Sequence, residues 1–150
     1  MEDTSIVDRL SSDLKAAMKA RDADRMATLR MAISAMNYRR IERNAALTPE
    51  EQEDVLRKQV KQRDDSIEEF TKAGRTELAD KERREREIIK EYLPAELTAD
   101  QLQAEVHSIL AGLAPDAKFG DAMKAVVPVL GKRANGRAIQ EAVKTAMAKR

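Results

Sequence analysis

The stretch "RDDSIEEFTKAGRTELADKERRERE", residues 63–87, decides how the first half of the chain folds. Its apolar residues recur at spacings of three and four, which indicates helix on both sides of Gly74. Glycine is the residue that most readily takes the left-handed backbone at a helix end. We therefore expect one helix to end near Ala73, and the next to run back as the second arm of an antiparallel hairpin.

A hairpin that turns at Gly74 pairs residues at equal distances from this glycine. Apolar layers then form at Phe70–Leu78, Val60–Ile88 and Leu56–Tyr92. Between these layers Arg63 falls opposite Glu85, within reach of the charge run "DKERRERE" (80–87). The run has two interpretations: a solvated face stabilised by ion pairs four residues apart, or a buried Arg63–Glu85 ion pair that sets the hairpin's register.

Helical spacing continues through the rest of the chain, without strand alternation or an internal repeat. Two capping boxes mark helix starts, Thr48 with Glu51 and Thr98 with Gln101. Pro128 predicts a kink or an early end in its helix. The expected helices run from about Ser5 to Arg21, from the N-cap Asp22, from Thr48 to Ala73, from the cap Thr76 to "YLP", from Thr98 to near Gly112, after Gly120, and from the N-cap Asn135.

The fold class predicted from these elements is all-α. The segment "PAELT" (94–98) is the best domain boundary, because Pro94 cannot continue the helix before it. Residues 1–94 are expected to form an amino-terminal helical domain of about four helices, including the long hairpin. Residues 95–150 are expected to form a small three-helix domain.

The composition excludes several classes of protein. The chain has 150 residues, of which 42% are hydrophobic and 37% charged, and it contains no cysteine. It lacks a run of apolar residues long enough for a membrane span, and its acidic start is unlike a secretory signal. We expect a cytoplasmic protein without disulfides, metal, cofactor or membrane segment.

Catalytic signatures are absent from the sequence. It has no phosphate-binding glycine loop and no serine nucleophile motif. His107 is the single histidine and lies among apolar helix residues, a setting typical of a structural side chain. We therefore expect no catalytic residue in this chain.

The carboxyl-terminal end is basic. Residues 1–94 carry 20 Lys and Arg against 21 Asp and Glu, whereas residues 118–150 carry eight cations against Asp121 and Glu141. Such a bias is either a solubilising surface or a site for an anionic partner. With Phe119 as the sole aromatic residue nearby, an RNA would be held by its phosphates and shape. The candidate RNA-binding residues surround the turn before the last helix: Lys124, Lys132, Arg133, Arg137 and Lys144.

Four segments resemble the YqeY-like proteins of the GatB/YqeY family over nearly the whole chain. They are "TLRMAISAMNYRRIE" (28–42), "KQRDDSIEEFTKAGRTELADKE" (61–82), "EREIIKEYLPAEL" (85–97) and "GKRANGRAIQEAVKTAM" (131–147). The resemblance implies an all-α protein whose last domain is similar to the tail of the B subunit of the glutamyl-tRNA/aspartyl-tRNA amidotransferase, which contacts tRNA. It also implies the family's label, carbon–nitrogen ligation with glutamine as amide donor.

The sequence departs from the family pattern at two positions. Asn135 stands where the family commonly has Asp, and Asp121 replaces a cation, which weakens the basic face. Three hypotheses follow. The protein is a non-catalytic partner of tRNA or of the tRNA-handling machinery, or an adaptor whose amino-terminal helices bind a partner helix, or one part of a larger amidotransferase.

Overall fold

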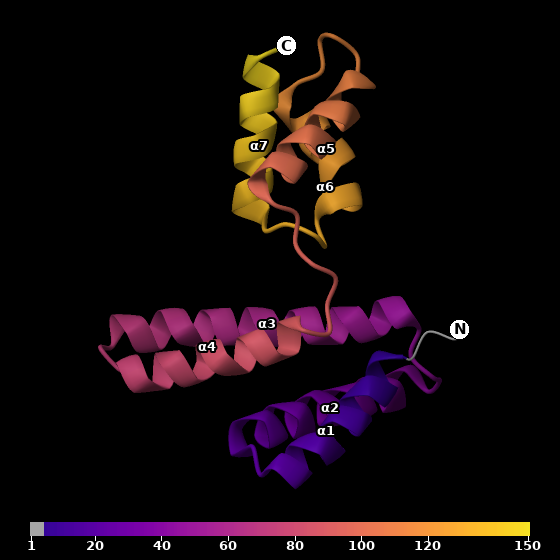
Figure 1. Cartoon of the computed structure of the whole chain (residues 1–150). Helices are drawn as coiled ribbons and strands as arrows, with labels where there is room; N and C mark the ends of the chain where they lie inside the picture. Colours follow the sequence, from indigo (N-terminus) through magenta and orange to yellow (C-terminus); the bar gives the residue numbers. More distant parts are fainter. Residues whose placement is uncertain (1–4) are drawn as a thin grey trace. The chain divides into compact units, whose positions relative to one another are not determined.

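A computed structural model describes residues 5–150, and the acidic start on which the expectation of no secretory signal partly rested lies outside this range. Throughout the described residues the chain is helical without strands, so the all-α prediction is confirmed. The helices are α1 (Ile6–Ala20), α2 (Ala23–Arg43), α3 (Pro49–Lys72), α4 (Thr76–Lys90), α5 (Ala99–Ala111), α6 (Phe119–Leu130) and α7 (Gly136–Ala148) (Figure 1). The chain divides into two compact units, Met1–Pro94 and Ala95–Arg150.

The first unit consists of two helical hairpins, α1 with α2 and α3 with α4 (Figure 1). Helix α2 lies against both arms of the second hairpin, so the two hairpins share one core. The largest fully buried side chains of this core are Leu10, Leu29, Met36, Leu56 and Ile89.

Helix ends in this unit follow the predicted caps with one exception. Asp22 accepts a hydrogen bond from the Arg25 N–H at 3.1 Å, the Thr48–Glu51 capping box is complete, and Gly74 is left-handed with φ +74°. The predicted cap at Thr76 is wrong, because α4 begins one residue earlier in its hydrogen bonding. The Arg75 carbonyl already accepts from the Ala79 N–H at 3.1 Å, which makes Thr76 the first helical residue.

Two polar side chains tie α1 to distant segments. Gln52 of α3 is buried, accepts a hydrogen bond from the Val7 N–H at 3.2 Å and donates to the Leu47 carbonyl at 3.1 Å. Tyr92, just beyond α4, donates its hydroxyl hydrogen bond to Asp13 of α1. These bonds join segments that no local sequence pattern links.

The second unit packs α5, α6 and α7 around an aliphatic core that includes Val106, Val126 and Val143. The Thr98–Gln101 capping box and the Asn135 cap are present as predicted. The expected early end at Pro128 is wrong, because α6 continues to Leu130. Proline removes one backbone donor, and Pro128 is exposed in the last turn, where a single missing bond is tolerated.

No helix among residues 5–150 combines the length and the apolar character needed to cross a membrane.

Candidate functional site

The α6–α7 turn is built by backbone hydrogen bonds. The Gly131 N–H donates to the Val127 carbonyl at 2.8 Å, and the Arg133 N–H donates to the Leu130 carbonyl at 2.9 Å. A Cβ atom at Gly131 would lie 2.6 Å from the Val127 oxygen, closer than side chains tolerate. Glycine is required here because a side chain does not fit. An unusual backbone conformation is not the reason, since the backbone at this residue is right-handed with φ −59°.

A further hydrogen bond fixes the turn to the start of the unit. The Leu97 N–H donates to the Arg133 carbonyl at 2.8 Å. Asn135 then begins α7, its side-chain oxygen accepting from the Ala138 N–H at 2.8 Å. The turn therefore holds the Arg133 backbone by both its N–H and its carbonyl, while the Arg133 side chain stays exposed.

The five predicted RNA-binding residues are all exposed on the second unit. Lys132 and Arg133 lie in the turn and Arg137 in the first turn of α7, so the fold brings these three together at the helix junction. Lys124 and Lys144 lie further away, each about two helical turns along its own helix. Lys144 is also partly engaged, with its ammonium nitrogen 3.8 Å from a Glu141 carboxylate oxygen.

Asp121, which was expected to weaken this basic face, has a structural role at the start of α6. Its carboxylate accepts a hydrogen bond from the Lys118 N–H at 3.1 Å and so caps the start of α6. Between Asp121 and Glu141 every charged residue is a cation. The turn and its two flanking helix ends therefore form a positively charged, exposed surface suited to an anion, with α7 contributing the partial positive charge of its amino terminus.

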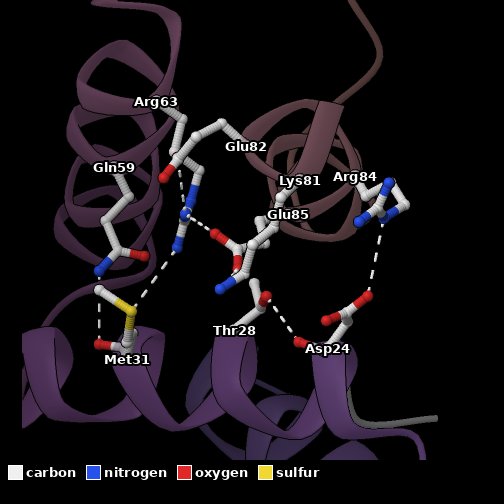
Figure 2. A network of polar contacts seen from close by, with 9 residues as sticks. All are labelled: Asp24, Thr28, Met31, Gln59, Arg63, Lys81, Glu82, Arg84 and Glu85. Carbon is white, nitrogen blue, oxygen red and sulfur yellow. Dashed lines mark hydrogen bonds and ion pairs between the residues drawn. The ribbon is translucent and has the colours of Figure 1, made fainter. Parts of the chain in front are cut away.

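The first unit contains a buried polar network between α2, α3 and α4 (Figure 2). Arg63 and Glu85 are buried, and the Arg63 guanidinium donates to the Glu85 carboxylate. The same guanidinium donates to Glu82 at 3.1 Å and lies 3.9 Å from the Met31 sulfur. The Arg63–Glu85 prediction is confirmed, and Arg63 additionally joins the hairpin to α2.

The rest of the charge run follows the solvated-face interpretation only in part, because Arg86 pairs with Asp64 of α3 and Arg84 with Asp24 of α2. Asp80 and Arg83 form an exposed pair three residues apart, with 2.6 Å between their nitrogen and oxygen atoms. Lys81 lies 4.0 Å from the Glu85 carboxylate, four residues along the helix. The run therefore combines exposed charges with a buried Glu85 and with residues that pair across to α2 and α3.

Sequence reasoning missed two groups around Arg63. Gln59 donates to the Met31 carbonyl at 3.3 Å (Figure 2), and Met31 itself contacts Arg63. Nothing in the local pattern of α2 marks Met31 as a partner of α3. Counting equal distances from Gly74 predicted the Arg63–Glu85 contact because these two residues lie on the two arms of the hairpin.

Groups suited to metal binding or acid–base chemistry are scarce in the part of the chain that the structure describes. No cluster of three or more histidine, cysteine or carboxylate side chains is arranged to hold a metal ion there. His107 lies exposed on α5.

Comparison of the sequence with known proteins identifies several relatives of this chain. A protein of Lachancea thermotolerans named "Altered inheritance of mitochondria protein 41, mitochondrial" is 36% identical over 126 residues, which are 80% of this chain and 67% of that protein. Proteins of the same name from Eremothecium gossypii and Clavispora lusitaniae are 33% and 39% identical, over 71% and 59% of this chain. The matches span 60% and 52% of these two relatives.

These names correct one expectation. The prediction of a cytoplasmic location is wrong by this comparison, because the relatives are named as mitochondrial proteins. That location was inferred partly from the absence of cysteine. A lack of cysteine is consistent with a reducing environment but does not identify a compartment.

The family assignment rests on a longer match. The family model described as "Yqey-like protein" matches residues 7–147, which include both units and every residue of the α6–α7 turn. The chain belongs to the YqeY-like family.

Proposed function

We propose that this YqeY-like protein is a non-catalytic module that associates with tRNA, alone or within the tRNA-handling machinery, through the α6–α7 turn. The observation that carries the proposal is the exposed position of Lys132, Arg133 and Arg137 around one rigid helix junction. Lys124 and Lys144 extend the same cationic surface along the two helices. Each of the five acts as a phosphate contact.

Phosphate contacts suit this surface better than base recognition does. The unit's single aromatic residue, Phe119, is exposed at the start of α6, away from the turn. Single-stranded sites combine cations with several stacking aromatics. A cationic turn without them favours the backbone of a folded RNA, which is recognised mainly by shape and phosphate position.

The test replaces Lys132, Arg133 and Arg137 together with Gln. Helicity and melting should be unchanged because exposed charges contribute little to stability. Affinity for a folded tRNA transcript should fall, and the slope of log affinity against log salt should become shallower by about two to three units. Binding is measured by fluorescence anisotropy over a salt series.

The matched control removes the same charge from the first unit by replacing Lys15, Lys19 and Arg40 with Gln. These residues are exposed as well. If both triple variants change the salt slope equally, overall charge explains the binding and the proposed site is wrong. An unchanged affinity and slope in the turn variant contradicts the proposal directly.

A further inference from the structure

Helix α2 presents an apolar stripe on the face opposite its buried side. Met31, Tyr38 and Ile41 are 56%, 72% and 70% exposed, although large apolar side chains are mostly buried in proteins. Together with Ala27 and Ser34 these residues form what we call the α2 stripe. Its five members follow one another at spacings of four, three, four and three residues. This spacing is that of the seam in a left-handed coiled coil.

Two separate hollows lie beside the α2 stripe, and together we call them the groove. One hollow of about 210 Å³ lies at Met31 and is lined on the α3 side by Gln59, Gln62 and Ser66. A second, of about 450 Å³, is lined by Arg39 and Glu42 of α2 and by Glu51, Asp54, Val55 and Lys58 of α3. The second hollow lies between α2 and α3, whereas the first also reaches Glu82 of α4.

Two polar atoms at the first hollow lack hydrogen-bond partners among residues 5–150. They are the Gln59 side-chain oxygen and the Arg63 Nε, both buried (Figure 2). Buried polar groups are nearly always paired. Both atoms are closed to solvent, so they are not themselves contacts for a partner in the groove.

We propose that the α2 stripe and this groove bind an amphipathic helix of another protein, one whose apolar seam is flanked by carboxylates. The spacing of the α2 stripe fits a helix as the occupant. The charge of α2 indicates the sign of the partner, because α2 carries five arginines against Asp24 and Glu42. Arg25 is paired with Glu91, and Arg39 and Arg43 are paired with Glu51. The positive charge left for a partner is therefore that of Arg30 and Arg40, which are both exposed. Among the described residues Arg30, adjacent to Met31, is exposed and lies in no ion pair.

A second copy of the chain fits less well. The α2 stripe is about 21 Å long, and a facing helix about 10 Å wide would cover roughly 200 Å² per partner. Stable dimers bury about 600 Å² or more per partner. Two α2 helices facing each other would also bring like charges together, whereas a helix lying in the groove covers α3 as well as α2.

The experiment uses the full chain and two designed helical peptides with the same apolar seam, one flanked by Glu and one by Lys. We expect the Glu-flanked peptide to bind saturably, about tenfold more tightly than the Lys-flanked one. Replacing both Tyr38 and Ile41 with Gln should weaken that binding at least about tenfold, as loss of anchor side chains does. Arg30→Gln should reduce the preference for the Glu-flanked peptide.

The matched control replaces Val127 and Val129 with Gln, since these are exposed apolar residues of the other unit. Equal effects of the two double variants, or no saturable binding of either peptide, overturn the proposal. Concentration-dependent dimerisation that the Tyr38/Ile41 variant abolishes, measured by sedimentation, overturns it in favour of a second copy. Loss of tRNA binding in that variant, with peptide binding unchanged, overturns it in favour of an RNA surface.

Discussion

Arg63 of α3 and Glu85 of α4 form a buried ion pair across 22 residues of sequence, between the apolar layers of the hairpin. Replacing Arg63 with Met leaves the Glu85 carboxylate buried without its partner. We expect a loss of about 3–5 kcal/mol in the free energy of unfolding, the usual cost of breaking a buried pair. Urea denaturation followed by circular dichroism measures it.

Two companion variants separate the charge effect from general disruption. Replacing both Arg63 and Glu85 with Met removes the unpaired charge and should restore most of the stability. Lys72→Met breaks the exposed Lys72–Glu68 pair of the same hairpin, where nitrogen and oxygen lie 2.9 Å apart, and should cost at most about 1 kcal/mol. A double variant no more stable than Arg63→Met would contradict this account.

Tyr92 links the end of α4 to α1, and its ionisation should unfold the protein at alkaline pH. Burial, and then the hydrogen bond to Asp13, raise the pKa of the Tyr92 phenol well above its ordinary value of 10.0. The unfolded chain therefore loses this proton at lower pH than the folded chain. The stabilisation is complete below about pH 10 and is lost progressively as the pH rises towards the folded-state pKa.

The chain has two tyrosines, so a Tyr38→Phe background makes tyrosinate absorbance report on Tyr92 alone. In that background absorbance and helicity should change together at high pH. Tyr92→Phe should remove the alkaline decline that this group causes. If Tyr92 instead ionised near the ordinary pKa of tyrosine without any loss of helicity, its burial and its hydrogen bond to Asp13 would contribute nothing to stability.

Glu51 should make the first unit sensitive to acid. Its hydrogen bond from the Thr48 N–H, and then the nearby Arg43 and Arg39, lower the pKa of this carboxyl below its ordinary value of 4.5. The stabilisation is therefore present above about pH 4.5 and is lost as the pH falls towards the folded-state pKa. Glu51→Gln keeps a capping side chain but should flatten the acid limb of the stability profile.

The free energy of unfolding is measured by urea titration at several acidic pH values, with Glu77→Gln as the control. Glu77 also lies in the first turn of its helix, α4, and is exposed. A Glu51→Gln profile that overlays the wild-type profile would rule out the capping carboxylate as the acid-sensitive group.

The two glycines on either side of the α6–α7 turn, Gly131 and Gly136, should differ in their tolerance of alanine. Gly131→Ala places a methyl group against the Val127 carbonyl oxygen and should destabilise the second unit by about 1–3 kcal/mol, as overpacking does. Gly136 has open space around it, so Gly136→Ala should be neutral or stabilise by up to about 1 kcal/mol through the unfolded state. Thermal melting compares the two, and equal effects would contradict the role of space.

Helices and most of their caps could be predicted because each depends on residues within one turn of one another. Asp22, Thr48 and Thr98 all bond to backbone groups three residues away. The Arg63–Glu85 pair was also accessible, since a single turn at Gly74 sets the distance of both residues from it. The errors were the cap at Thr76 and the early end at Pro128, where the position of a residue within a turn decides its role.

Contacts between hairpins could not be predicted in the same way. Gln52 with Val7, and Arg63 with Met31, join segments whose relative position depends on the packing of the whole first unit. The exposure of Tyr38 has the same origin. Its spacing on α2 indicates an apolar face, but only the packed core shows that Leu29 and Met36 face inward while Tyr38 remains outside.

The hydrogen bond from Leu97 to the Arg133 carbonyl has a consequence for how this surface can change over evolutionary time. Folding uses a backbone group that every amino acid supplies at this position, and it leaves the guanidinium uninvolved in the turn's architecture. A lineage can therefore exchange Arg133 for a neutral or acidic residue in one substitution and alter what the turn attracts, without having to rebuild the domain that presents it.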